Sequence, residues 1–358
     1  RAVEADILAA REQLKQIEQS VLLTVIQAYV DVVRDAESLR IREENVGVLR
    51  RQLEEAQARF EVGEITRTDV AQSEARLSAA QALLAQSQAL LAISRSNYAA
   101  VVGQNPGTLQ PPPALPGVPT SVDEAFVVGQ DENPALRAAQ LNERASRSRV
   151  AQAKSDLRPS VTAQVRYTAG GETVIPFDRR DLDQTVAASV IVTQPIYAGG
   201  VRRSRIRQQQ QVANADLVAI EGQRREVLRT VSQGWNQLLA ARASIGANEE
   251  QVRAARIAAE GVREEASVGL RTTLDVLNAE LELRNAQLAV AQSRRDDYVA
   301  QANLLAAMGR LEAGRLAPGV ERYDPAVNFQ RVRGKGAVPW EPLVQAADTL
   351  LAPAPKPS

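Results

Sequence analysis

The chain has 358 residues, and its 43 Lys and Arg balance 43 Asp and Glu, so charge gives no indication of a nucleic-acid partner. It contains no Cys and no His, which excludes the usual nucleophile–base pairs and the commonest soft metal ligands and fits an oxidising compartment. Aromatic residues make up only 3%, as is typical of long helices rather than of one large globular core. No apolar run approaches the roughly 18 to 20 residues of a membrane helix, so any membrane crossing is predicted to use strands.

The first 104 residues are predicted to form one very long helix, a break and a shorter helix. The break is the segment EVGEITRTDV, residues 61–70. Gly63 provides the C-cap of the long helix. Thr66, Thr68 and Asp69 provide the N-cap chemistry of the shorter one, with an acid that suits the helix dipole. Capping alone accounts for Asp69, so its presence does not by itself indicate a function.

Residues 105–132 form a Pro-rich linker that carries a short helix. Ser121 and Glu124 are the predicted capping box of this helix. A separate helix opens at Asn133, has proline in its first turn, and is predicted to run to Arg158.

Two segments between residues 160 and 198 have the alternating pattern of β-strands. They cover residues 160–168 and 185–197, and the polar, turn-rich loop of residues 170–183 separates them. About nine or ten alternating residues match a tilted transmembrane strand, whereas a soluble hairpin packed on helices is the alternative. A hairpin is marginal alone and its open edges are not tolerated in lipid, so it is predicted to close with other strands. The predicted apolar face comprises Val161, Ala163, Val165, Tyr167, Val186, Ala188, Val190 and Val192.

The second half of the chain follows the same plan as the first. A proline-free helix is predicted from Val201 to about Val268, with a length of roughly 100 Å. Gly269 ends it, and a shorter helix is predicted from Thr273 to about Leu311. The two short helices of this half, about 39 and 26 residues long, together match the long helix to within a turn. Stacked end to end, they would build a uniform wall beside it.

An internal duplication relates the two halves. The chain aligns with itself without gaps at an offset of 206 residues, the difference between Gly269 and Gly63. Compositional bias does not explain paired glycines and acids at a helix break, so we interpret the match as a repeated structural unit. The matching pairs include Val21 and Val227, Val62 and Val268, Gly63 and Gly269, Thr66 and Thr272, Asp69 and Asp275, Glu74 and Glu280, and Gly103 and Gly309.

The repeat also predicts what lies beyond the ends of the two halves. A sister hairpin, a short helix and a signal peptide are expected ahead of residue 1. The sequence after Pro318 is irregular, and LLAPAPKPS at residues 350–358 is predicted to be disordered or to lie along the surface. The predicted organisation is a first repeat at 1–104, the linker and short helix at 105–132, a second repeat at 133–312 that includes the hairpin at 160–198, and a tail at 313–358.

Three motifs then suggest a family. They are TQPIYAGG at residues 193–200, EVGEITRTDV at 61–70 and SVGLRTTLDVLNAE at 267–280. In this order and spacing they resemble the TolC family of outer-membrane efflux and secretion proteins over residues 1–312. The tail segment YDPAVNFQRVRGKG, residues 323–336, is similar to that of the subgroup serving type I secretion.

The resemblance implies a homotrimer in the outer membrane of a Gram-negative bacterium. Each protomer would give four strands to a twelve-stranded β-barrel, and long antiparallel helical hairpins would form an α-barrel tunnel through the periplasm. Such a protein is a passive exit duct for type I protein secretion or multidrug efflux, opened at its periplasmic tip. The implied partners are a periplasmic adaptor, an inner-membrane ABC or other transporter and outer-membrane lipid, with no cofactor, no metal and no nucleic acid.

The resemblance also assigns roles to residues at the two helix breaks. Three symmetry copies of Asp275 would ring the closed periplasmic mouth, while Asn278 stands where the best-known member has a second acid. A cation near a helix start is unfavourable, so Arg271 is expected to have a carboxylate partner. The family pattern would tie it to Thr68 and Asp69, although the family's Tyr in this network is Ala266 here, which predicts a looser gate. The residues expected to dock an adaptor are Gly63, Glu64, Ile65, Thr66, Gly269, Leu270, Arg271 and Thr272.

Three other classes of protein fit the sequence less well. A soluble coiled-coil scaffold would explain the helices but not the alternating strands or the paired breaks. A periplasmic adaptor would need a β-rich lipoyl-like domain beside its hairpin, and none is visible. An enzyme is weaker still, because acidic pairs on solvated helices usually signify i,i+4 charge pairing and no nucleophile or phosphate loop accompanies them.

Overall fold

The computed structural model describes residues 2–170, 183–317, 319, 324–333, 342 and 346. The chain divides into two units, Arg1–Glu312 and Ala313–Ser358. The second unit contains the short helices α7, Ala313–Leu316, and α8, Pro325–Arg333. The first unit contains α1 Ala2–Glu61, α2 Arg67–Val102, α3 Val122–Glu132, α4 Pro134–Ser155, β1 Ser160–Gly170, β2 Asp183–Thr193, α5 Val201–Ser267 and α6 Thr273–Met308.

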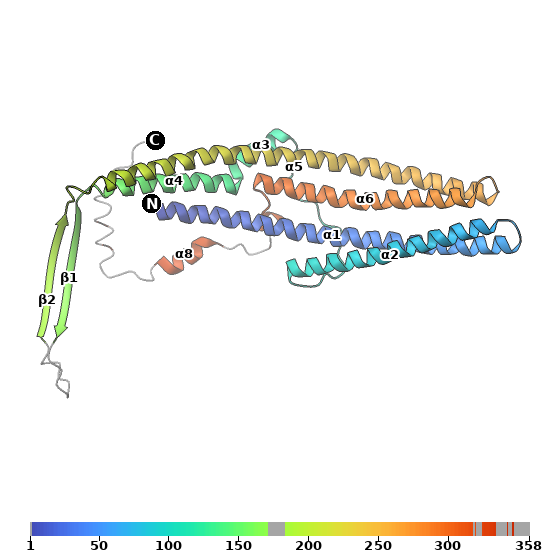
Figure 1. Ribbon diagram of the computed structural model, residues 1–358, viewed down its shortest axis with the longest axis horizontal. Coiled ribbons are helices and arrows are strands. Elements are labelled where there is room, and N and C mark those ends of the chain that lie inside the picture. The colour runs from blue at the N-terminus through green and yellow to red at the C-terminus, as the bar shows by residue number, and fades with distance from the viewer. Residues whose placement is uncertain are drawn as a thin grey trace, which may run out of the picture. The chain divides into compact units, whose positions relative to one another are not determined.

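Two long helical hairpins make up most of the first unit (Figure 1). In the first, α2 folds back along α1, and in the second, α6 folds back along α5. The short helix α4 packs against both long helices, and α1 also contacts α6. The two hairpins therefore lie side by side with their turns at the same end.

The structure repeats at the offset found in the sequence. Helix α1 ends at Glu61 and α5 at Ser267, and these two positions differ by 206. Both α2 and α6 are 36 residues long, and their first residues, Arg67 and Thr273, also differ by 206. Each half is thus one long helix, a turn and one shorter helix, as predicted.

Several predicted boundaries are wrong by a few residues. Helix α4 ends at Ser155, before Arg158, and α6 ends at Met308, before Leu311. Their 22 and 36 residues sum to 58 against 67 in α5, so the predicted equality to within a turn is wrong. Strand β2 ends at Thr193 and not at Tyr197, because a proline follows within two residues and cannot donate to the ladder.

The capping box predicted for α3 is only half formed. The Ser121 hydroxyl accepts a hydrogen bond from the Glu124 backbone N–H at 3.2 Å, as expected. The Glu124 carboxylate, however, accepts from the backbone N–H of Thr120 at 2.9 Å, one residue earlier than a capping box requires.

The two short helices of the second repeat meet end to end. Asn133 caps α4, because its Oδ1 accepts from the backbone N–H of Ala135 at 3.0 Å and of Leu136 at 3.2 Å. Its Nδ2 donates to the carbonyl of Ala307 at 2.9 Å, which satisfies a free carbonyl at the end of α6. Gly309 completes the junction with a φ of +83°, a conformation that favours glycine. One asparagine side chain therefore links the end of α6 to the start of α4.

Small and aliphatic side chains fill the seams between the helices. The largest cluster lies where α3, α4, α5 and α6 meet, and two smaller clusters lie nearer the turns. Alanine allows helix axes to approach closely without a thick core. The buried members of the largest cluster are Ala125, Leu136, Val227, Val231, Leu238, Ala300, Leu304 and Met308.

The two strands of the β-hairpin pair antiparallel, from Ser160 with Thr193 to Gly170 with Asp183. Val161 pairs with Val192 and Ala163 with Val190, so the predicted apolar residues share one face. Val165, in mid-strand, is 75% exposed. None of the helices in the described ranges is long and apolar enough to span a membrane. Most of the loop predicted at 170–183 and the segment at 350–358 lie outside the described residues.

Candidate docking tips and gate

A turn follows each long helix, at residues 61–70 in the first repeat and at the start of residues 267–280 in the second, and we refer to these turns as the tips. They have the same backbone geometry. In the first tip, the Gly63 N–H bonds the carbonyl of Phe60 at 3.0 Å and the Glu64 N–H bonds that of Arg59 at 2.9 Å. The second tip repeats this pattern from Gly269 and Leu270. These are Schellman motifs, which need a left-handed residue, and the φ angles of the two glycines are +79° and +80°. The predicted helix-ending role of both glycines is confirmed.

Each shorter helix starts with a complete capping box. The Asp69 carboxylate accepts from the Thr66 N–H at 2.9 Å and from its hydroxyl at 2.7 Å. Asp275 accepts in the same way from Thr272, at 3.0 and 2.8 Å. In both tips, hydrogen bonds from the threonine hydroxyl, followed by those from its backbone, lower the pKa of the aspartate. Both acids are therefore ionised at neutral pH.

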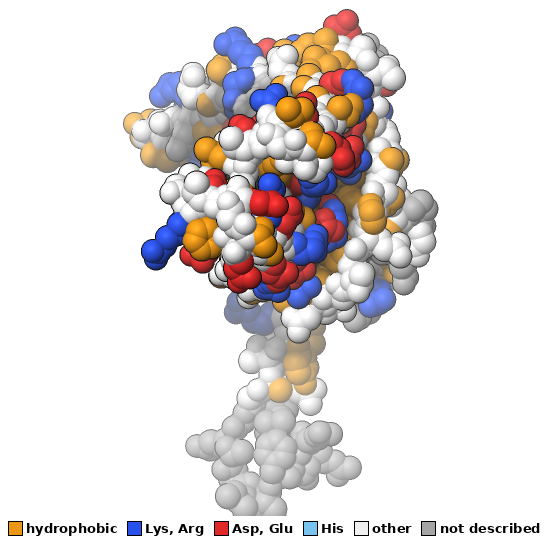
Figure 2. Space-filling view, turned by 90° about the vertical axis from the view of Figure 1, so that its right-hand side faces the viewer, with side chains coloured by type: hydrophobic (Ala, Val, Ile, Leu, Met, Phe, Trp, Pro, Cys, Tyr) orange, Lys and Arg blue, Asp and Glu red, His pale blue; other side chains and the backbone are white. Residues whose placement is uncertain are grey.

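Apolar side chains project from both tips. Val62 and its repeat partner Val268 are 72% and 70% exposed, and Leu270 is 75% exposed. Figure 2 looks onto this end of the helices and shows apolar side chains interspersed with acidic and basic ones. Such a mixed, exposed surface is suited to contact with another protein.

The two tips differ in their charged pairs. In the first, Arg59 contacts Glu64 at 3.0 Å. In the second, Arg271 contacts Glu265 at 2.7 Å, and this hydrogen bond is the main cause that raises the pKa of Arg271. The carboxylate partner of Arg271 thus lies within its own tip, six residues earlier in the chain. Sequence reasoning missed Glu265, although it is the repeat counterpart of Arg59 with the opposite charge.

A cleft of about 610 Å³ lies between the tips. Its lining includes some of the predicted docking residues and some of the predicted gate residues. The predicted residues that do not line it are Gly63, Thr68, Leu270, Asp275 and Asn278. Among the described residues, no bond joins Arg271 to the first tip, so its tie to Thr68 and Asp69 stays a prediction. The predicted residues in the lining are Glu64, Ile65, Thr66, Asp69, Gly269, Arg271 and Thr272.

Another contact joins the two hairpins near the tips. The guanidinium of Arg76 on α2 donates to Asn278 Oδ1 on α6 at 3.0 Å. Beside it, the buried Leu277 packs with Leu49 of α1 and Ala80 of α2. The sequence gives one indication of this role for Arg76: the matching position of the second repeat holds Glu282, a residue of opposite charge.

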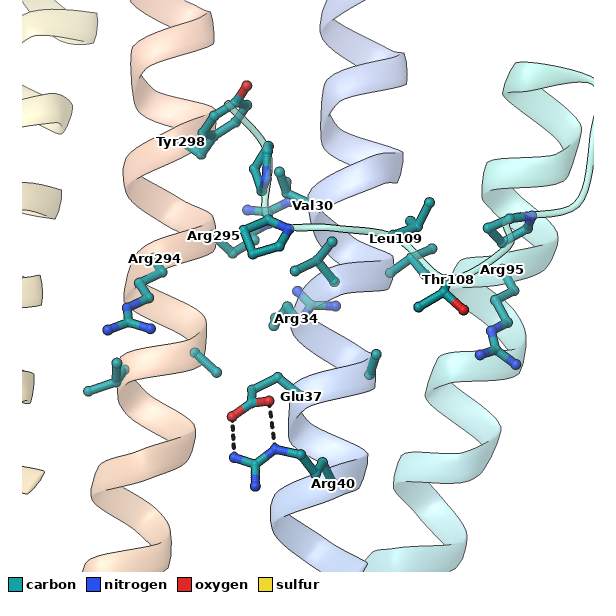
Figure 3. Close-up of a pocket in the computed structure, with 18 of the residues that line it drawn as sticks. Val30, Arg34, Glu37, Arg40, Arg95, Thr108, Leu109, Arg294, Arg295 and Tyr298 are labelled. Carbon is teal, nitrogen blue, oxygen red and sulfur yellow. Dashed lines mark hydrogen bonds and ion pairs between the residues drawn. The ribbon is translucent and has the colours of Figure 1, made fainter. Parts of the chain in front are cut away.

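A second hollow, of about 840 Å³, lies under the Pro-rich linker, between α1, α2 and α6 (Figure 3). Tyr29 donates to the carbonyl of Gln110 at 2.8 Å and Tyr298 to that of Pro113 at 2.9 Å, which fixes the linker to α1 and α6. Most arginines in its wall are already paired with acids, as Arg40 is with Glu37. The hollow therefore presents no strong charge of one sign. In the described part of the chain, no group of three or more acidic side chains is placed to hold a metal ion.

Comparison with known proteins defines the class. The family model described as "Outer membrane efflux protein" matches residues 1–104 and 130–310. The chain therefore belongs to this family, and it is an outer-membrane export channel protein of the kind found in Gram-negative bacteria.

Individual relatives agree with this assignment. The chain is 35% identical to the outer membrane efflux protein BepC of Brucella suis biovar 1 (strain 1330), a match that covers 93% of this chain and 73% of BepC. It is 25% identical to the outer membrane protein TolC of Escherichia coli (strain K12), over 82% of this chain and 62% of TolC. The fold is similar to that of the Campylobacter jejuni CmeC outer membrane channel, with a TM-score of 0.72, 14% identity and coverage of 95% of this chain and 71% of that structure.

The family membership confirms the predicted resemblance, channel function and outer-membrane location, and it favours them over a soluble scaffold or an adaptor. The relatives are channel proteins and not enzymes. The match to residues 1–104 and 130–310 also spans both repeats of the helical hairpin.

Proposed function

We propose that the protein is the exit duct of a tripartite export system, in which three copies close a twelve-stranded β-barrel and a helical tunnel. The observation that carries this proposal is the hairpin, whose paired strands expose one continuous apolar face to the surroundings. An isolated hairpin with open edges is not stable in lipid, so other strands must complete it. The cargo we propose is a secreted polypeptide or a small molecule, and the tail motif favours type I secretion.

Membrane fractionation with mass measurement tests the assembly. The full-length protein should be extracted by detergent as a trimer, and a monodisperse water-soluble monomer would contradict the proposal. Val165→Arg places a charge on the apolar face at mid-strand, where the cost in a bilayer is about 2–4 kcal/mol. It should reduce the amount of assembled trimer, whereas Gln164→Arg on the opposite face should be tolerated.

The tips are the proposed dock for a periplasmic adaptor, which in turn binds an ABC or other inner-membrane transporter. Exposed apolar residues that recur in both repeats, Val62 and Val268, support this role. Replacing Gly63 and Gly269 by Glu should abolish export while trimers still assemble. Because those changes also strain the backbone, Val62→Glu with Val268→Glu is the sharper test.

The matched control for the docking test is Val127→Glu, which changes an equally exposed valine on α3, away from the tips. Crosslinking from the tips to co-purifying periplasmic proteins should be lost in the tip variant and retained in the control. Equal crosslinking in both would remove the tips from the dock.

The gate is the third part of the proposal, with Asp275 ringing the mouth and Arg271 holding neighbouring hairpins together through Thr68 and Asp69. Like charges crowded in a narrow mouth bind cations, so multivalent cations should block the closed channel. Asp275→Asn should weaken the block while it keeps an oxygen to accept from Thr272. Asp123→Asn, which removes an exposed acid from the first turn of α3, away from the tips, is the control.

Arg271→Ser should raise single-channel conductance. Each exposed ion pair contributes only about 0–1 kcal/mol, but three released together shift an open–closed balance of a few kcal/mol. Recordings in planar bilayers measure both effects. Unchanged conductance for Arg271→Ser, together with unchanged block for Asp275→Asn, would remove these residues from the gate.

A further inference from the structure

A group of basic residues lies where the helices meet the β-hairpin. It occupies the last turn of α4, the link to β1 and the first two turns of α5, and Asp156 is the one acid in these segments. We refer to this group as the basic patch. Its members are Lys154, Arg158, Arg202, Arg203, Arg205 and Arg207.

The two segments of the basic patch are held together at the base of the hairpin. Helices α4 and α5 pack against each other, and Figure 1 shows the end of α4 beside the start of α5, where β1 begins and β2 ends. The guanidinium of Arg202 donates to the backbone carbonyl of Asp156. The Gln194 Nε2 donates to the carbonyl of Leu157 at 3.4 Å. The patch is therefore contiguous in space and adjoins the first residue of β1, Ser160, and the last residue of β2, Thr193.

Helix stability does not explain the arginines of α5. The N-terminus of a helix carries a partial positive charge that disfavours cations. Helix α5 has no acid in its first turn, and Gly200 offers no side-chain cap. Besides Arg202, three more arginines lie within the first seven residues of α5. Their charges interact unfavourably with the helix dipole and so destabilise this end of the helix.

These three side chains, Arg203, Arg205 and Arg207, are exposed and make no ion pair or hydrogen bond with any residue that the structure describes. Further along the same helix the pattern changes. Arg229 and Arg253 each pair with a glutamate three residues earlier. Five α5 arginines have no partner among the described residues, and three of them lie in the first seven positions, whereas Arg225 and Arg256 stand apart further along.

Apolar surface begins directly beside the basic patch. The second rung of the hairpin pairs Val161 with Val192, which are 68% and 65% exposed. Between β2 and α5, Ile196 and Tyr197 are 97% and 90% exposed. The composition is that of a membrane–water boundary, where an apolar strand surface is followed by an exposed aromatic residue and then by unpaired cations.

We propose that the basic patch binds the phosphates of anionic phospholipids in the leaflet that faces the helices. The proposal rests on the proposed function, which places the hairpin in the outer membrane. A guanidinium can donate two parallel hydrogen bonds to one phosphate, and the anion would offset the unfavourable charge at the start of α5. The patch would then fix the depth at which the helices meet the bilayer.

Lipid binding by the full-length trimer tests this inference. Native mass spectrometry would count phosphatidylglycerol and phosphatidylcholine retained by the purified protein. The test variant carries Arg203→Gln, Arg205→Gln and Arg207→Gln. The control carries Arg95→Gln, Arg225→Gln and Arg256→Gln, three exposed arginines elsewhere that also lack a partner among the described residues. Both variants lose the same total charge.

The test variant should lose at least about tenfold in its preference for phosphatidylglycerol, since each basic residue near a membrane surface contributes roughly a factor of five. The control should keep the preference, and added salt should weaken it in the wild type. Equal preference in both variants would overturn the inference. A second outcome would also overturn it: the patch binds poly-glutamate but not phosphatidylglycerol. The ligand of the patch would then be an acidic polymer and not a lipid.

Two readouts separate this inference from the proposed function. Trimer mass and thermal midpoint in phosphatidylcholine check that the variants fold. A protein that never enters a membrane would contradict the proposed function, whereas a membrane-inserted trimer without headgroup preference would contradict only the lipid assignment.

Discussion

The two tips share their backbone and differ in their side-chain partners. Both have a left-handed glycine, a Schellman pair of hydrogen bonds and a Thr–Asp capping box. Yet Arg59 in the first tip corresponds to Glu265 in the second, and Ile65 corresponds to Arg271. The two repeats therefore share the residues that reverse the chain, and they differ in the charged side chains that each tip exposes.

The C-terminal ends of α2 and α6 can be compared in the same way. Gly103 and Gly309 have φ angles of +84° and +83°. A Cβ at Gly103 would meet nothing within 4 Å, whereas a Cβ at Gly309 would lie 2.6 Å from the carbonyl oxygen of Glu132. Gly103 is thus needed for its conformation alone, and Gly309 for its conformation and for the junction with α4.

The largest expected effect separates these two glycines. Gly103→Ala should cost about 1 kcal/mol through left-handed strain. Gly309→Ala adds a clash with backbone atoms that cannot rotate away, and should cost about 3 kcal/mol or more. Thermal midpoints of the two purified variants measure the difference. Equal midpoints would mean that the end-to-end junction between α6 and α4 does not form as described.

A smaller effect is expected at the caps of the tips. Thr66→Val and Thr272→Val each remove the hydroxyl that accepts from the third helical N–H, at a typical cost of about 1 kcal/mol in local helix stability. Hydrogen exchange at the starts of α2 and α6 should accelerate, by a similar factor in both tips if they are equivalent. Thr273→Val is the control, because it changes a neighbouring threonine that has no capping bond. Unequal acceleration would show that the tips are not interchangeable even as backbone turns.

The same caps predict a pH dependence. The pKa of Asp69 and of Asp275 lies below the ordinary value of 3.8 because threonine donors favour the charged form. Their contribution to the caps is therefore complete above 3.8 and is lost as the pH falls through the lower folded-state values. Hydrogen exchange corrected for its intrinsic rate should show the first turns of α2 and α6 unchanged from about pH 7 to 5, and fraying only below 3.8. Fraying already at pH 5 would contradict the assignment of these carboxylates as the caps.

Much of this architecture follows from local sequence signals. Gly63 and Gly269 can be recognised as helix ends because a left-handed position favours glycine over any residue with a Cβ. The face on which each strand residue lies could be predicted because successive side chains of a strand point to opposite faces. The partner of Arg76 could not be predicted, since it depends on how two hairpins are placed side by side, and helical periodicity leaves that placement open. The partner of Arg271 was missed for a different reason: Glu265 lies six residues earlier, across the turn, outside the i,i+3 and i,i+4 spacings of helical pairs. The end of α4 was also missed, because helix C-termini without glycine carry weak signals.

The smallest expected effect concerns the contact that joins the two hairpins near their tips. Arg76 donates to Asn278 at 3.0 Å near the surface, where one hydrogen bond contributes about 0.5–1.5 kcal/mol. Arg76→Gln should loosen the hairpins slightly, and Asn278→Asp should tighten them, because the same contact becomes an ion pair. Since the chain has no cysteine, spin labels introduced at the exposed positions Glu74 and Glu282 can report the separation of α2 and α6. The distance distribution should broaden in Arg76→Gln and narrow in Asn278→Asp, and Arg95→Gln on the same helix should leave it unchanged. If Asn278→Asp broadens the distribution instead, its charge is repelled by the acids of the tips more strongly than it is attracted by Arg76, and the second acid is absent from this position for that reason.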